Sequence, residues 1–142
     1  MKKRSFFYAS AISVILMLSN FNSNAQRGYT TFTEEEGIKV MYKWQRAVFY
    51  KKDSDAVLNL RISNQKEAHV LVNFGVGFYK DGLLLLESDE NQLCMKPGQT
   101  KRGGLAGLRF AVEDMKKEDA KDESYSWEFT TFDVAETDEC IK

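Results

Sequence analysis

The stretch HVLVNFGVGFY, residues 69–79, alternates between apolar side chains and side chains that are mostly polar or small. Its alternating apolar positions are Val70, Val72, Phe74, Val76 and Phe78. Successive side chains of a β-strand point to opposite faces, so this period of two residues predicts a strand with one face on a hydrophobic core.

The same period recurs on both sides of this stretch. It is found in AVLNLRIS, residues 56–63, and in LAGLRFAV, residues 105–112. After the opening stretch, Lys80-Asp81-Gly82 predicts a tight turn into Leu83–Leu86, because an Asp-Gly step favours the backbone angles of a hairpin turn. Residues 125–129 place apolar side chains at odd positions, whereas Phe132 and Val134 occupy even ones, which predicts a β-bulge near residues 130–131.

Two segments allow alternative interpretations. Residues 38–50 alternate at Ile38, Val40, Tyr42 and Trp44 and are rich in β-branched and aromatic residues, which favours a strand. A helix remains the alternative, because residues 33–36, TEEE, resemble a capping box. The charged residues 113–123 show no core stripe and predict a solvated connection or one short exposed helix.

These signals amount to about seven short strands, with no long helix and no internal repeat. They predict an all-β, two-sheet antiparallel sandwich over residues 37–142. The architecture resembles the immunoglobulin-like and fibronectin-III-like domains of exported bacterial proteins, although the strand at 56–63 lacks the antibody-type cysteine. An up-and-down barrel is the alternative, although a domain of this length is short for a barrel that holds a ligand.

The first 25 residues have the organisation of a secretory signal peptide. Lys2, Lys3 and Arg4 precede an apolar run, and the small-residue site SNA leads to predicted cleavage between Ala25 and Gln26. A retained membrane anchor is less favoured, because spanning a bilayer takes roughly 20 apolar residues. The form of the leader resembles export signals of the Bacteroidota. Residues 26–36 are then expected to form an N-terminal extension of a periplasmic or secreted protein.

The two cysteines fit an oxidising compartment. Cys94 lies just before Pro97-Gly98, and its only possible partner in the chain is Cys140. A cysteine pair in a small exported domain is usually bridged, so a Cys94–Cys140 disulfide is predicted. A redox pair or a thiol nucleophile is less favoured, because neither cysteine lies in a CxxC arrangement or beside a histidine.

Charge excludes several classes of partner. The chain has 20 Lys+Arg and 21 Asp+Glu, and removal of the leader takes three basic residues, which leaves 17 against 21. This formal charge of −4 gives no reason to expect nucleic acid or an anionic membrane surface as a partner, since both require clustered positive charge.

No motif indicates catalysis, a cofactor or a metal. His69 is the only histidine and stands at the start of a strand, where a surface role is commoner than a base. The acidic clusters at residues 87–90 and 133–139 lack the spacing of a calcium loop and are expected to be solvated. We therefore expect a protein that is not an enzyme and that takes no cofactor.

Two features of the predicted sheet indicate a surface for a protein partner or for self-association. Gly75 and Gly77 leave a strip of bare backbone on one strand face, unless a bulky neighbour such as Trp44 or Trp127 covers it. Four consecutive leucines follow the turn, and in an extended strand two of them, Leu83 and Leu85, are expected to face away from the core.

Carbohydrate binding is the alternative function. It requires exposed aromatic platforms, for which the candidates are Tyr42, Trp44, Tyr79 and Trp127, with Tyr50 as a further one. Two coplanar exposed rings would favour sugar. Their absence, together with an exposed Leu83 and Leu85, would favour protein.

Overall fold

A computed structural model describes residues 28–140. The predicted signal peptide, residues 1–25, and its cleavage site lie outside the described residues. Within residues 28–140 the chain forms strands and two short 3₁₀ helices. These elements are β1 (Thr30–Glu35), β2 (Ile38–Arg46), β3 (Asp55–Asn64), β4 (His69–Lys80), β5 (Leu83–Glu87), β6 (Asn91–Met95), β7 (Thr100–Arg102), η1 (Gly104–Ala106), β8 (Arg109–Lys116), η2 (Asp119–Lys121) and β9 (Tyr125–Thr137).

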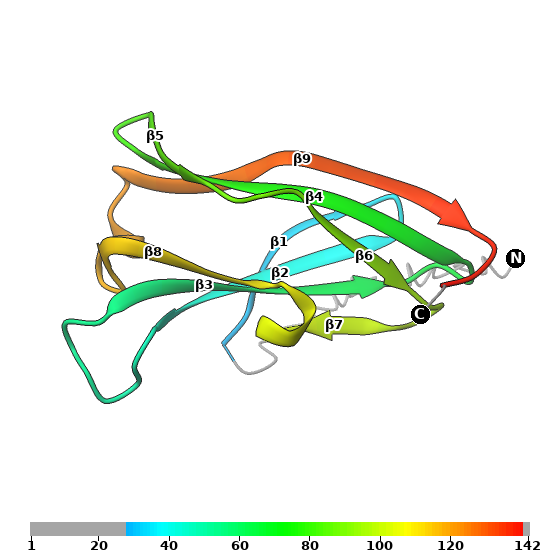
Figure 1. Cartoon of the computed structure of the whole chain (residues 1–142), viewed down its shortest axis with the longest axis horizontal. Helices are drawn as coiled ribbons and strands as arrows, with labels where there is room; N and C mark the ends of the chain where they lie inside the picture. Colours follow the sequence, from blue (N-terminus) through cyan, green and yellow to red (C-terminus); the bar gives the residue numbers. More distant parts are fainter. Residues whose placement is uncertain (1–27, 141–142) are drawn as a thin grey trace, which may run out of the picture.

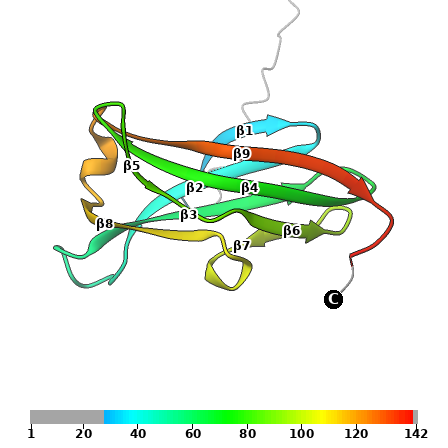
Figure 2. The ribbon, with the colours of Figure 1, turned by 45° about the horizontal axis from the view of Figure 1, so that its top comes forward.

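The strands form two antiparallel sheets packed face to face, which confirms the predicted sandwich (Figures 1 and 2). In the first, which we call sheet A, the order is β1-β2-β3, and β7 and β8 both pair with the far edge of β3. In the second, sheet B, one edge of β4 pairs with β9 along its whole length. The other edge of β4 pairs with β6 near its start and with β5 near its end.

The structure has nine strands where the sequence predicted about seven. The difference arises because two long ladders are interrupted. β5 and β6 lie in line against β4, and β7 and β8 lie in line against β3. The strand order also differs from the A-B-E-D order of the larger sheet of an immunoglobulin constant domain, in which only the first two strands are consecutive neighbours before the fifth. Here three consecutive strands lie side by side.

The predicted alternation accounts for the core. The even-numbered side chains of β3 and β4 point between the sheets and are buried, whereas most odd-numbered ones point outward. The largest fully buried core side chains of these two strands are Leu58, Leu60, Ile62, Phe74 and Phe78. Removal of this apolar surface from water is the main force that holds the sheets together.

The segment at 38–50 is a strand, not a helix, but it ends at Arg46. Residues 47–54 form a turn that carries Phe49 and Tyr50 into solvent. The segment at 26–36, expected to be an extension, contains β1, which pairs with β2. Its alternation was missed because only Phe32 is a large apolar residue on this edge strand.

The charged segment at 113–123 combines a strand end with a short helix. β8 continues to Lys116, and residues 113–115 form an extra loop in its pairing with β3. Met115 is 3% exposed and belongs to the core, so the prediction of no core contact here was wrong. One apolar residue among charged ones gives no periodic signal, which is why the sequence did not indicate it. The three-residue helix η2 follows.

The bulge predicted near residues 130–131 is present. Gly75 pairs with Thr131 and Val76 with Phe129, so Thr130 is the extra residue on β9. This single insertion returns Phe132 and Val134 to the core side after the change of phase.

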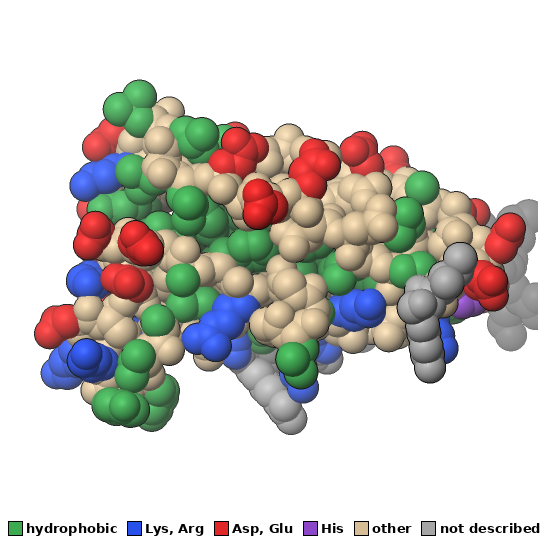
Figure 3. All heavy atoms as spheres, viewed as in Figure 1, with side chains coloured by type: hydrophobic (Ala, Val, Ile, Leu, Met, Phe, Trp, Pro, Cys, Tyr) green, Lys and Arg blue, Asp and Glu red, His purple; other side chains and the backbone are tan. Residues whose placement is uncertain are grey.

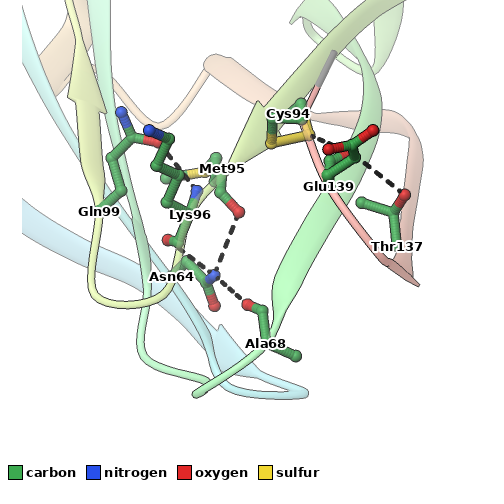
Figure 4. The surroundings of a disulfide bond; sticks show 9 residues. Asn64, Ala68, Cys94, Met95, Lys96, Gln99, Thr137 and Glu139 are labelled. Carbon is green, nitrogen blue, oxygen red and sulfur yellow. Dashed lines mark hydrogen bonds between the residues drawn. A yellow bond between two sulfur atoms is a disulfide. The ribbon is translucent and has the colours of Figure 1, made fainter.

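Cys94 and Cys140 form the predicted disulfide, with 5.5 Å between their Cα atoms (Figure 4). Cys94 of β6 stands opposite Leu71, on the outer face of sheet B. The bond therefore ties the segment after β9 across the start of β4 to β6, and it does not join the two sheets. Across residues 28–140, no helix is long and apolar enough to cross a membrane.

Candidate interaction surface

β5 is an edge strand with an apolar surface open to solvent. It pairs with β4 on one side only, and Leu85 is the extra residue of a bulge in that pairing. The exposed fractions are 73% for Leu83, 52% for Leu84, 50% for Leu85 and 42% for Leu86. The sequence predicted that two leucines would face outward, and in the structure all four are exposed. Unpaired apolar edges are generally blunted by charge or covered by another element, and β5 has neither protection along its leucines.

A groove lies between β5 and the facing edge of sheet A. It has a volume of about 600 Å³. Leu85 and Leu86 contribute to one side, residues 111–115 of β8 contribute to the other, and Lys80 and Tyr125 complete the lining. Figure 3 shows apolar side chains in this hollow between the two sheet edges. Because β5 is an outer strand of sheet B and β8 of sheet A, the sandwich is open to solvent here.

The surroundings of the groove are mainly acidic. Residues 80–90 and 109–116 carry six carboxylates, at Asp81, Glu87, Asp89, Glu90, Glu113 and Asp114. None of them forms an ion pair with another described residue. The three basic side chains of these segments have partners of their own: Lys116 pairs with Asp55, and Arg109 donates to the carbonyl of Ala47. Lys80, which lines the groove, interacts with Tyr125, whose hydrogen bond raises the pKa of Lys80.

Gly75 and Gly77 do not form an open strip. Both are buried, and the space above them is filled by the bulged Thr130 and by Tyr79. A Cβ atom at Gly75 would lie 2.6 Å from Thr130 Oγ1, and one at Gly77 would lie 2.9 Å from Thr130 Cγ2. The covering side chains are therefore not Trp44 or Trp127. The two glycines make room for the bulge of β9, and they leave no groove on which a partner could rest.

The proposed sugar platform is only partly assembled. Tyr42, Trp44 and Trp127 line one pocket of about 230 Å³ at the other side of the sandwich, whereas Tyr79 lies on the outer face of sheet B. The rings of Tyr42 and Trp127 meet at 66°, and Phe32 stacks on Trp127 with centroids 4.2 Å apart. The rings of Tyr42, Trp44 and Trp127 are half-buried against the core, so they are not a coplanar exposed pair.

Tyr79 is also occupied by its surroundings. Its ring lies against Gly77, and a hydrogen bond with Glu128 raises the pKa of its hydroxyl. The most exposed aromatic side chains of the described chain are neighbours, Phe49 at 91% and Tyr50 at 87% exposed. The sequence indicated Tyr50 as a candidate but did not indicate Phe49 beside it. Their place at a turn could have been suspected from the lysines and Asp53 that follow them.

The remaining sequence candidates are dispersed. His69 is the first residue of β4 and half-buried, and it shares a shallow pocket with Glu136 and Asp138. No cluster of three or more His, Cys, Asp or Glu side chains within residues 28–140 is arranged to hold a metal ion.

The chain matches no protein-family model, no curated protein and no solved structure.

Proposed function

We propose that this protein is an exported, non-catalytic interaction module that binds another envelope or secreted protein through the edge of sheet B. The observation that carries the proposal is the row of four exposed leucines on the unpaired strand β5. Contiguous exposed apolar side chains are uncommon on proteins that act alone, and they mark surfaces for association. Export is supported by the leader sequence and by the Cys94–Cys140 disulfide.

A second protein is a better fit than a second copy of this chain. If two β5 strands paired antiparallel about their leucines, Leu83 would stand opposite Leu86, and Glu87 of each copy would face Gly82 of the other, beside Asp81. Like charges so placed weaken strand pairing. The acidic surroundings of the groove thus favour a partner with basic side chains near its apolar contact.

The test replaces Leu83 and Leu85 together with serine. Both side chains are at least half exposed, so the free energy of unfolding should change by less than about 1 kcal/mol. Recovery of the native partner from the envelope by the tagged protein should fall by more than about tenfold if the leucines are central to the contact.

Leu105→Ser is the matched control, because Leu105 is fully exposed on η1, outside the groove lining. It should leave partner recovery unchanged. Equal recovery by the double variant and by the control, with equal particle size by light scattering, would refute the proposed function.

Carbohydrate binding is the second candidate, favoured by the convergence of Tyr42, Trp44 and Trp127 on one pocket. It is weaker because the pocket lining contains no amide or carboxyl side chain, and such groups usually bind the hydroxyls of neutral sugars.

A further inference from the structure

The outward face of sheet A gathers basic side chains that are scattered along the sequence. The even-numbered residues of β2 and β3 point into the core, so Lys39 and Lys43 of β2 and Arg61 of β3 point outward. The register adds Arg102 of β7 and Arg109 of β8 to the same face, since directly opposed residues share a face. Figure 3 shows basic side chains along this side over much of the length of the molecule, and acidic ones along sheet B.

The arrangement places like charges next to one another. Arg61 stands directly opposite Arg102, with Cβ atoms expected about 5 Å apart. In the next outward row, Asn59 lies between Lys43 on one side and Arg109 on the other. Opposed like charges weaken a sheet, so an adjacent Arg pair in a protein with an acidic balance requires an explanation other than folding.

Within residues 28–140, little negative charge offsets this group. Lys39 pairs with Glu34 at 3.4 Å, but Lys43, Arg61, Arg102 and Arg109 form no ion pair with another described residue. Lys43 lies over the ring of Tyr29, and Arg109 donates to the carbonyl of Ala47. The Nε atom of Arg61 is buried and has no hydrogen-bond partner among the described residues.

The rest of the face is polar rather than apolar. Met41 and Val57 point outward here but are buried, at 5% and 1% exposed. Beside the arginines, the paired hydroxyls of Ser63 and Thr100 lie 2.8 Å apart. The Asn59 amide is buried, at 7% exposed, and donates to the carbonyl of Val57. The large exposed apolar side chains of the described chain lie on β1, β5, η1 and the turn at 47–54 instead.

We propose that this face of sheet A binds an acidic polysaccharide. Guanidinium groups bind carboxylate, sulfate or phosphate groups with paired hydrogen bonds, and the neighbouring hydroxyls of Ser63 and Thr100 suit sugar hydroxyls. A membrane surface fits less well, because each basic residue contributes only about 1 kcal/mol there and the outward apolar side chains of β2 and β3, Met41 and Val57, are buried. The site is separate from the β5 groove, so it stands or falls independently of the proposed function.

The test measures binding of the purified, disulfide-intact protein to polygalacturonate and dextran sulfate, with neutral dextran for comparison. Both anionic chains should bind and neutral dextran should not, and the affinity should fall steeply between about 50 mM and about 200 mM salt. Arg102→Glu should weaken binding by more than about tenfold. It should also raise the urea midpoint, because it replaces a repelling pair with an ion pair opposite Arg61.

Lys52→Glu supplies the control for net charge. It makes the same change in charge at an exposed position of the turn at 47–54, outside the strands that carry this face. It should leave the affinity within about twofold, a difference of under 1 kcal/mol. If both variants weakened binding equally, the effect would come from the overall charge and not from this face, and the proposal would be overturned. Failure of both anionic chains to bind, or stronger binding to vesicles with one quarter phosphatidylglycerol than to either chain, would overturn it as well.

Discussion

At the scale of single residues, Asn64 has the most demanding position in the fold. It is 1% exposed at the end of β3. Its Nδ2 donates to the carbonyls of Ala68 at 2.9 Å and Lys96 at 3.0 Å, and more weakly to that of Met95 (Figure 4). Its Oδ1 accepts from the backbone N–H of Lys66. One amide at the end of β3 in sheet A thus holds the turn that leads to β4 and the end of β6 in sheet B.

Asn64→Ala should therefore be strongly destabilising. The substitution leaves several buried backbone groups without partners, and each such group costs about 1–3 kcal/mol, so a loss of about 2–4 kcal/mol is expected in urea unfolding. Gln92→Ala is the control, since Gln92 also donates one side-chain hydrogen bond, to Asn73, but lies on the surface. It should cost less than about 0.5 kcal/mol. Similar midpoints for the two variants would contradict this role for Asn64.

At the scale of strands and connections, the sequence was informative wherever one apolar face was regular. The alternation in β3, β4 and β9 predicted those strands, and the phase change in β9 predicted the bulge at Thr130. The pattern failed where a strand was on an edge, as in β1, or where a single Met115 entered the core from a charged segment. Local periodicity shows which face of a strand is buried, and it contains no information about isolated contacts.

Neither candidate surface could be fully located from the sequence. The exposure of Leu83 and Leu85 followed from four leucines in a strand, but the groove beside them required β8 to be placed on the facing edge. The basic face was missed because net charge averages over the chain. Arg102 and Arg109 join Arg61 only because β7 and β8 both pair with β3, which is a long-range feature of the topology.

The connection around η2 should be sensitive to acid. Arg46 donates to Glu118 at 2.6 Å and lowers the pKa of that carboxyl, and the backbone N–H of Ser124 lowers the pKa of Asp122. A carboxyl whose pKa is lower in the folded state adds stability above its unfolded pKa, near 4, and that stability is lost as pH falls through the folded value.

Glu118→Gln should therefore lower the urea midpoint near neutral pH and should converge with the unsubstituted protein as the pH falls from about 6 to about 3. In a chain that carries Arg46→Gln, the same substitution should have little effect at either pH, since the partner is gone. A constant difference at all pH values would show that the Arg46–Glu118 contact is not the cause.

At the scale of the whole molecule, the two ends of the sandwich are held differently. Near the start of β4, the disulfide and Asn64 fasten β6, β9 and the β3–β4 turn together. Near the end of β4, the edges of β5 and β8 stay apart and form the groove. The nine residue steps along β4 from Leu71 to Lys80 separate these regions by about 30 Å. The covalent bond therefore stabilises the fold without shaping the proposed partner surface.

Replacement of both Cys94 and Cys140 with alanine tests this division. Opening a loop of 46 residues should lower the free energy of unfolding by about 4 kcal/mol, because the unfolded chain regains conformational freedom. In conditions where the variant remains folded, the affinity for the partner of the β5 groove should stay within about twofold of the original, a difference of under 1 kcal/mol. Alkylation without reductant should label neither cysteine of the unsubstituted protein. If the folded variant lost partner binding while keeping its circular dichroism, the disulfide end and the groove would be coupled, and the open edge of β5 alone would not explain recognition.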